Sequence, residues 1–242
     1  MSAASSEVEC FDAKIDNIHA YIARPAQGGR AGVLLLPMAT GIGEQMRSFA
    51  QEIATAGLTA VSWDPWHGAS SDNTSMESLL ERVNNFEDSA SLSEMKRLVD
   101  YMSTTIELEK IGVIGWCVGG RFALLLAAQD ERLVSVVAYH PTVPWPAPSN
   151  HTLDASELVA HIKVPVMAMY PKEDSIVSWD SYTRLRNALE SRSEGASILH
   201  VYPGAEHGFA NRGMHGNPAN ARAFAISWPQ VLDFLRLTTS GF

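Results

Sequence analysis

Residues 110–129 read KIGVIGWCVGGRFALLLAAQ, an apolar run that meets a helix-forming run at a glycine-flanked corner. Cys117 stands at the corner, with Gly115 two residues before it and Gly119 two residues after it. In the Gly-x-Ser-x-Gly nucleophile elbow, glycines at these places relieve crowding where a strand turns sharply into a helix. Backbone N–H groups at the start of such a helix favour a thiolate. The stretch predicts a nucleophilic Cys117, although most free cysteines are small core residues.

Size and charge limit the possible functions. The 242 residues fit one α/β domain, and no linker rich in Pro, Gly and Ser divides residues 1–242. The formal net charge of −9 is spread without long runs of like charge, which argues against a nucleic-acid or anionic-membrane surface. We therefore expect a single domain that acts on a small molecule, with a monomer favoured over an oligomer.

The first residues and the cysteine count indicate a reducing compartment. Residues 1–10 lack the basic start and apolar stretch of a secretory signal, and no later apolar run is long enough to span a bilayer. The two cysteines, Cys10 and Cys117, lack the spacing of a metal site. The sequence thus predicts a cytoplasmic protein without a disulfide framework or a zinc site.

Apolar runs rich in β-forming residues alternate with helical patterns, which is typical of a mostly parallel sheet covered by helices on both faces. The expected parallel strands are Ala31–Pro37, Thr59–Trp63, Ile111–Gly115, Val134–Tyr139, Val164–Tyr170 and Ala196–Tyr202. An antiparallel start to the sheet is expected at Val8–Asp12 and Ala20–Ala23. The expected helices are Glu44–Ala56, Met76–Phe86, Leu92–Ser103, Val118–Gln129, Trp179–Ser191 and Asn220–Leu237. The pattern predicts an α/β fold with about seven or eight strands.

Two segments are expected to be loops because proline or glycine crowds them, namely Pro141–Asn150 and Gly204–Asn217. In an open parallel sheet, functional loops collect beyond the carboxyl ends of the strands. The segments that should share this rim are those after Pro37, Trp63, Gly115, Tyr139, Tyr170 and Tyr202. We therefore look for the chemistry there.

A hydrolytic cysteine normally needs an imidazole to take its proton, because an unperturbed pKa of about 8.5 leaves little thiolate at neutral pH. His207 is the best placed of the eight histidines, in the run Pro203–Phe209 directly after the last expected strand. His215 is a weaker reserve, His200 lies within a strand, and His161 lies at the amino end of one. The pattern favours His207 as the catalytic base.

A catalytic imidazole is held in one tautomer by an acceptor on its other nitrogen, commonly a carboxylate. Asp174 follows the preceding expected strand and leads over Glu173 and Asp180, because the apolar residues after it can close the loop and turn it inward. The chain order Cys117, Asp174, His207 is the order of nucleophile, acid and histidine in α/β-hydrolases. Order together with strand-end placement predicts a catalytic triad.

Acyl transfer also needs hydrogen-bond donors for the developing oxyanion, and removing one costs roughly 3–4 kcal/mol. The backbone N–H of Val118, directly after the nucleophile, is the first expected donor. The second is the backbone N–H of Ala39, after the run Leu34–Met38, because Pro37 has no N–H to give.

Two runs resemble the dienelactone hydrolase family: Gly-Trp-Cys-Val-Gly-Gly-Arg at residues 115–121 and Gly-Ala-Glu-His-Gly-Phe-Ala at residues 204–210. The run Ala20–Pro25 also looks like the opening strand of that family. The resemblance extends over nearly the whole chain, from about Ile15 to Phe234.

This resemblance implies an α/β-hydrolase fold and hydrolysis of an enol-lactone such as dienelactone to maleylacetate. It implies Cys117 as the group that attacks the lactone carbonyl, His207 as the proton carrier and Asp174 as its orienter. It also implies that no metal or cofactor is required.

One residue departs from the family pattern. Members of the family carry a glutamate at the end of the oxyanion strand, in contact with the resting thiol, whereas Met38 stands at the matching place here. A methionine cannot accept the thiol proton, and it makes that wall of the substrate site more apolar. Either His207 alone ionises Cys117, or the preferred substrate differs.

Arginines of the family hold the substrate carboxylate, one of them just after the catalytic histidine. Arg212 is the nearest match, and Arg82 is a second candidate. For each, the alternative is an ordinary solvated charge. Arg121, on the expected elbow helix, is interpreted as structural.

Further substrate contacts are expected on the rim. Trp66 and His67 follow an expected strand, and the candidates to line an apolar cleft are Tyr139, Trp145 and Phe209. Such aromatic residues are more often core or lid packing. The proline-rich run Pro141–Pro148 is a candidate cover.

The primary prediction is a cysteine-dependent lactone or ester hydrolase, and two alternatives stay open. A general carboxylesterase or thioesterase would use the same triad and is favoured by Met38. A redox-sensing or ligand-binding protein would oxidise Cys117 or bind a ligand without turnover. It would need a resolving cysteine nearby, and Cys10 is far off in sequence.

Overall fold

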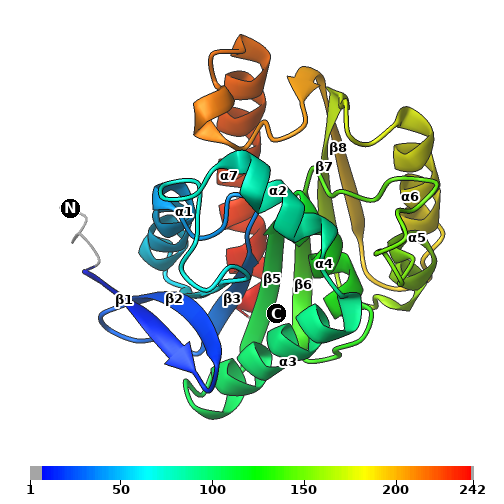
Figure 1. Cartoon of the computed structure of the whole chain (residues 1–242). Helices are drawn as coiled ribbons and strands as arrows, with labels where there is room; N and C mark the ends of the chain where they lie inside the picture. The colour runs from blue at the N-terminus through cyan, green and yellow to red at the C-terminus, as the bar shows by residue number, and fades with distance from the viewer. Residues whose placement is uncertain (1–6, 241–242) are drawn as a thin grey trace.

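In the computed structural model, which describes residues 7–240, one sheet of eight strands lies between two layers of helices (Figure 1). The strands are β1 (Val8–Ile15), β2 (Ile18–Pro25), β3 (Ala31–Leu36), β4 (Thr59–Trp63), β5 (Lys110–Trp116), β6 (Leu133–Tyr139), β7 (Val166–Glu173) and β8 (Ser197–Glu206). The helices are α1 (Glu44–Thr55), α2 (Met76–Asn84), α3 (Asp88–Thr104), α4 (Val118–Ala127), α5 (Ala155–Leu158), α6 (Trp179–Glu190) and α7 (Pro218–Thr239), with 3-10 turns at Val159–His161 and Arg212–Met214. The predicted α/β class and strand number are confirmed.

The strand order is β1-β2-β4-β3-β5-β6-β7-β8. β1 and β2 form an antiparallel hairpin, β2 pairs antiparallel with β4, and every later pairing is parallel. The hairpin turns at Asp16, whose φ of 53° is one that aspartate tolerates better than most residues. The antiparallel start and the parallel remainder both match the expectation from the sequence.

Alternate residues of each central strand enter two separate apolar clusters, because successive side chains point to opposite faces of a sheet. In β3, Val33 and Leu35 belong to a cluster that also holds residues of α1 and α7, whereas Leu34 and Leu36 belong to one that also holds residues of α3, α4 and α6. Both faces of the sheet are therefore buried, as the near-continuous apolar runs of the sequence require. Among residues 7–240, none of the helices combines the length and apolar character that a membrane span needs.

The strand ends differ from the sequence prediction at the β7–β8 edge. β7 continues to Glu173 and β8 to Glu206, and these two residues are register partners. The residues from Gly204 to Glu206 are thus strand and not loop, which corrects the expected start of the glycine-rich loop. Pro203 is tolerated inside the strand because β8 lies at the edge of the sheet.

This extension positions two loops for the chemistry. Asp174 follows β7 directly and His207 follows β8 directly, at the same end of neighbouring parallel strands. In Figure 1, β7 and β8 rise to the top of the view, and α2 crosses in front of the upper end of the sheet. The carboxyl ends of the parallel strands therefore carry the predicted residues on one rim.

Candidate active site

Cys117 occupies the corner between β5 and α4, with φ 55° and ψ −120°. This left-handed conformation is rare for a residue with a Cβ and marks a strained turn. A Cβ on Gly115 would lie 2.0 Å from the carbonyl oxygen of Gly119, and a Cβ on Gly119 would lie 2.1 Å from that of Leu36. Only glycine fits at either place, so the corner forms as the sequence predicts.

Cys117, His207 and Asp174 lie in hydrogen-bond contact in series. Sγ of Cys117 is 3.2 Å from Nε2 of His207, and Nδ1 of His207 is 2.8 Å from Oδ2 of Asp174. The backbone N–H groups of Ile176 and Val177 each donate to Oδ1 of Asp174 at 2.8 Å. The carboxylate is thus fixed by its own loop, and it fixes in turn the ring that faces the sulfur.

These contacts favour a thiolate–imidazolium pair. Burial raises the pKa of Cys117, but the hydrogen bond and charge of His207, the Thr142 hydroxyl and the Val118 N–H outweigh it, so that the thiol pKa is lowered. Burial lowers the pKa of His207, yet its bonds to Asp174 and Cys117 raise that pKa to about 10. Both pKa shifts favour the nucleophilic thiolate form of the sulfur.

The two expected oxyanion donors lie beside the sulfur and at the end of β3. The Val118 N–H bonds to the sulfur itself. The Ala39 N–H has no acceptor within residues 7–240, while the Ala39 carbonyl accepts from Nε1 of Trp66 at 2.9 Å. Met38 is buried in the same apolar cluster that Cys117 packs against. Trp66 therefore holds the loop that carries the second expected donor.

Two polar residues that no sequence pattern singled out lie against these groups. Oγ1 of Thr142 is 3.2 Å from Sγ of Cys117. The ring of His140 packs against the ring of His207. His140 directly follows β6 and Thr142 comes two residues later, so their position past the carboxyl end of a strand is the signal that could have found them.

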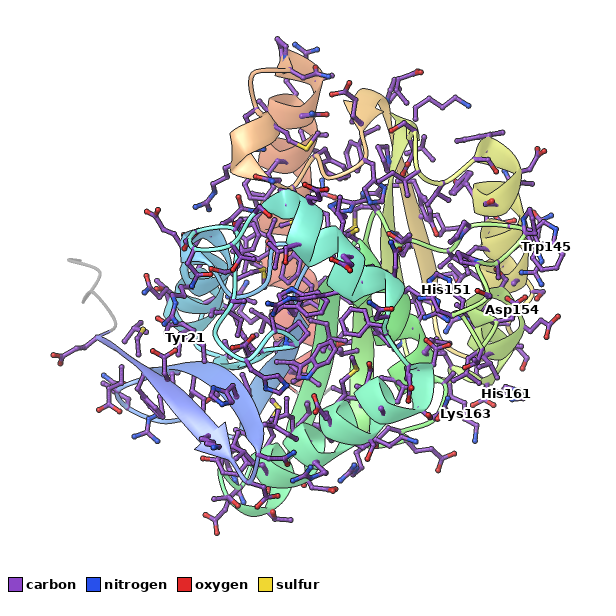
Figure 2. All side chains as sticks on the ribbon, viewed as in Figure 1. Tyr21, Trp145, His151, Asp154, His161 and Lys163 are labelled. Carbon is purple, nitrogen blue, oxygen red and sulfur yellow. The ribbon has the colours of Figure 1, made fainter. Side chains whose placement is uncertain are left out.

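The competing histidines and carboxylates have other places. His200 and His215 make hydrogen bonds to nearby groups of their own segments. His161 precedes β7, at the amino end of the strands (Figure 2). Glu173 and Asp180 are exposed. Within residues 7–240, no group of three or more His, Cys, Asp or Glu side chains is placed to hold a metal ion.

The two arginines expected to bind a substrate carboxylate already have partners. The Arg212 guanidinium pairs with Glu52 of α1 and also donates to Ser48. Arg82 is exposed and donates to the carbonyl oxygen of Trp66 at 3.4 Å. These contacts do not favour either arginine as a carboxylate-binding group, and the role stays a prediction.

Arg121 has the structural place expected for it. Its guanidinium forms a two-pronged pair with Asp88 at 2.6 and 2.8 Å and donates to the carbonyl oxygen of Leu153 at 2.8 Å. The Arg121 and Asp88 side chains are only 2% and 1% exposed. The pair ties the elbow helix α4 to the start of α3.

The expected cleft residues Tyr139 and Phe209 are fully buried, which corrects that expectation. Tyr139 is the last residue of β6, and its side chain faces α7, where the hydroxyl donates to Oγ of Ser227 at 3.0 Å. His67 is exposed, with its ring 5.5 Å from that of His19. Tyr139 and Phe209 are core residues beneath the site.

The proline-rich run Pro141–Pro148 follows β6. It contacts Cys117 through Thr142 near its start and α6 through Trp145. The Trp145 backbone N–H donates to Oγ of Ser181 at 2.8 Å, and the Arg184 guanidinium lies 4.2 Å from the Trp145 ring centre. Figure 2 shows Trp145 beside α6 at the edge of the molecule. The run is thus anchored on α6, and its action as a cover stays a prediction.

Most of the chain is similar to proteins of one known family. A family model described as "Dienelactone hydrolase family" matches residues 18–239. The Escherichia coli strain K12 protein named "Putative carboxymethylenebutenolidase" is 26% identical over 227 residues, 91% of this chain and 83% of that one. The "Carboxymethylenebutenolidase" of Rhodococcus opacus is 26% identical over 212 residues, 86% of this chain and 82% of that one.

Solved structures show the same fold. The crystal structure of a Klebsiella pneumoniae protein, described as "Putative Dienelactone Hydrolase", superposes with a TM-score of 0.82. The match covers 95% of this chain and 98% of that one at 20% sequence identity. The likeness establishes a shared architecture over the whole sheet.

Proposed function

Because the chain belongs to the dienelactone hydrolase family and is a carboxylic-ester hydrolase, we propose that it cleaves small esters or lactones through Cys117, His207 and Asp174. The observation that carries the proposal is the unbroken contact from the sulfur to Nε2 of His207 and from Nδ1 to Asp174. The nucleophile, the proton carrier and its orienter are thereby assigned to three adjacent groups.

In the acylation step, the Cys117 thiolate attacks the carbonyl carbon of the substrate. The oxygen takes up the negative charge and accepts hydrogen bonds from the backbone N–H groups of Val118 and Ala39. The tetrahedral intermediate collapses as His207 gives its Nε2 proton to the leaving oxygen. In a lactone the leaving oxygen stays attached to the acyl chain, so ring opening leaves one thioester on the enzyme.

In the second step, neutral His207 takes a proton from water, and the resulting hydroxide attacks the thioester carbonyl. The sulfur leaves as a thiolate, and the imidazolium–thiolate pair is restored. Asp174 holds the ring in one orientation throughout, because it accepts from Nδ1 while its other oxygen is held by the loop. The cycle uses water and these side chains, and it calls for no cofactor.

The test of this mechanism is hydrolysis of an activated aryl ester by purified wild-type protein and by Cys117→Ala. We expect the variant to lose activity while circular dichroism shows an unchanged fold. Cys10→Ala is the matched control, because Cys10 is exposed on β1, and it should keep wild-type activity. Full activity in Cys117→Ala would end the proposal.

For the substrate, the leading candidate is an enol-lactone of the dienelactone type, supported by the family and by relatives named carboxymethylenebutenolidase. A neutral carboxylic ester or thioester is the second candidate. It is favoured by the apolar Met38 and by the pairing of Arg212 with Glu52, which occupies a charge that a substrate carboxylate would need.

Rates on cis- and trans-dienelactone, compared with a neutral aryl ester, separate the two candidates. A higher kcat/KM on the anionic lactones supports the first, and a higher kcat/KM on the neutral ester supports the second. Arg212→Gln adds a second readout, since it should raise KM for the lactones only if this arginine binds their carboxylate.

A further inference from the structure

We propose that Thr142 is a further catalytic residue, whose hydroxyl donates a hydrogen bond to the Cys117 thiolate and holds the nucleophile ionised before substrate binds. The inference rests on the proposed thiol mechanism and adds to it a residue that touches the reacting atom. It explains how the thiol can be ionised although Met38 stands where the family pattern has a carboxylate in contact with the thiol.

The direction of this hydrogen bond follows from the charge on sulfur. Oγ1 of Thr142 lies 3.2 Å from Sγ of Cys117. A thiolate has no proton to give and can only accept, so the hydroxyl must be the donor. Within residues 7–240 the Thr142 hydroxyl has no other hydrogen-bond partner. The proton is therefore free to point at the sulfur.

Backbone contacts fix the hydroxyl at this place. The Thr142 N–H donates to the Cys117 carbonyl oxygen at 3.0 Å, and the Cys117 N–H donates to the Tyr139 carbonyl oxygen at 3.0 Å. Cys117 is thus bonded through its backbone both to the last residue of β6 and to the segment that follows β6. A β-branched side chain has few rotamers, so an anchored backbone also anchors Oγ1.

The hydroxyl acts in the opposite sense to a carboxylate. A carboxylate next to the sulfur would accept the thiol proton and repel a thiolate, whereas a hydroxyl donates and stabilises the thiolate. His207, Val118 and Thr142 all bond to the sulfur and lower the pKa of the thiol. On this proposal, the nucleophile ionises without help from the substrate. Cys117 should therefore react with a small alkylating agent at neutral pH in the absence of any substrate.

The experiment measures the rate of Cys117 alkylation by iodoacetamide against pH, in a Cys10→Ala background that leaves one thiol. Thr142→Val removes the hydroxyl at nearly constant shape. We expect its alkylation midpoint to rise by about one pH unit, as loss of a hydrogen bond to a charged group implies. The plateau rate at high pH should rise about threefold, because a more basic thiolate is more nucleophilic.

Three further variants complete the design. Thr142→Ser restores the hydroxyl, and its midpoint should return close to that of the parent. Thr183→Val is the matched control, because the Thr183 hydroxyl donates to the Trp179 carbonyl oxygen on α6, and it should leave the midpoint unchanged. If Thr142→Val does not fold, Thr142→Ala replaces it as the variant without the hydroxyl, with the same expected rise in the alkylation midpoint.

An alkylation midpoint that stays at the parent value in the folded Thr142 variant would overturn the proposal. This result is distinct from failure of the proposed function, which is judged by ester hydrolysis in Cys117→Ala. If Cys117 were not the hydrolytic nucleophile, the alkylation midpoint would still report whether Thr142 holds its thiolate.

Discussion

The rings of His140 and His207 lie 4.9 Å apart with an interplanar angle of 64°, the edge of one against the face of the other. His207 has a partner on each nitrogen, whereas neither nitrogen of the fully buried His140 has one within residues 7–240. Burial, and then the charge of His207, lower the pKa of His140 well below its ordinary value. A neutral imidazole thus packs directly against a charged one.

His140 should make the protein less stable in mild acid. Its folded-state pKa is lowered, so below about pH 6.5 the unfolded chain binds a proton that the folded chain does not, and stability falls as pH falls. We expect His140→Phe to flatten the pH dependence of the unfolding free energy between pH 6.5 and 5, by an amount that approaches about 1.4 kcal/mol per pH unit toward pH 5. Urea unfolding of both proteins across this range provides the measurement.

At pH 8, His140 is neutral in both the folded and the unfolded chain. The difference in unfolding free energy between wild type and His140→Phe then reports only the change in packing. His151 should keep part of the acid slope in both proteins, since burial and the Arg121 charge lower its pKa to about 4. Parallel curves for wild type and His140→Phe would show that His140 takes up a proton in the folded state, contrary to the prediction.

The kcat/KM for ester hydrolysis should show a bell-shaped dependence on pH. Protonation of the Cys117 thiolate removes the nucleophile at low pH, and deprotonation of the His207 imidazolium removes the acid at high pH. Burial lowers the pKa of His207, but Asp174 and Cys117 raise it to about 10, so the alkaline limb of kcat/KM should lie near pH 10. An alkaline limb near pH 7 would contradict a thiolate–imidazolium pair at rest.

Asp174→Asn tests whether Asp174 raises the pKa of His207 and so sets the alkaline limb of the kcat/KM profile. The amide keeps the shape of the carboxylate but removes its charge, so the alkaline limb should move to lower pH and kcat should fall roughly 10³-fold to 10⁴-fold. Glu173→Gln is the control, because that neighbouring carboxylate is exposed, and it should leave the profile unchanged. Equal profiles for the two variants would argue against Asp174 as the partner of His207.

The sequence predicted the position of Cys117, Asp174 and His207 because each adjoins the end of a regular element with a local signature. The prediction that Tyr139 lines a cleft was wrong for a physical reason. Successive side chains of a strand point to opposite faces, so at the last residue of β6 a shift of one position exchanges the site for the core. Thr142 and His140 were not predicted, because no local sequence pattern shows which side chain after a strand turns toward the nucleophile. Such contacts depend on how the segment after β6 meets the elbow, which is a tertiary property.

The same limit applies to the Arg121–Asp88 pair, whose partners lie 33 residues apart. Arg121→Met would leave Asp88 buried without its counter-charge, and we expect a loss of about 3–5 kcal/mol in the free energy of unfolding. Adding Asp88→Leu should recover much of that loss, because it removes the orphaned charge. Urea denaturation of the single and double variants measures both effects.

Arg236→Met is the matched control on α7, where Arg236 and Asp233 form an exposed pair at 3.0 Å. An exposed pair contributes about 0–1 kcal/mol, so this variant should stay close to wild type. If Arg121→Met were equally mild, the buried pair would not be what holds α4 against α3.

Gly119→Ala tests whether the elbow depends on backbone contact with β3. The new methyl would lie 2.1 Å from the Leu36 carbonyl oxygen and 2.5 Å from that of Pro37, so the backbone must move. We expect a loss of about 3 kcal/mol or more in stability, and a drop in kcat/KM of roughly 10²-fold as the Ala39 N–H shifts. Gly216→Ala, where no heavy atom lies within 4 Å of the added methyl, should stay within about 0.5 kcal/mol of wild type. Thermal unfolding and ester hydrolysis measured side by side decide the matter, since a fully active and stable Gly119→Ala would mean that the oxyanion loop does not rest on the elbow.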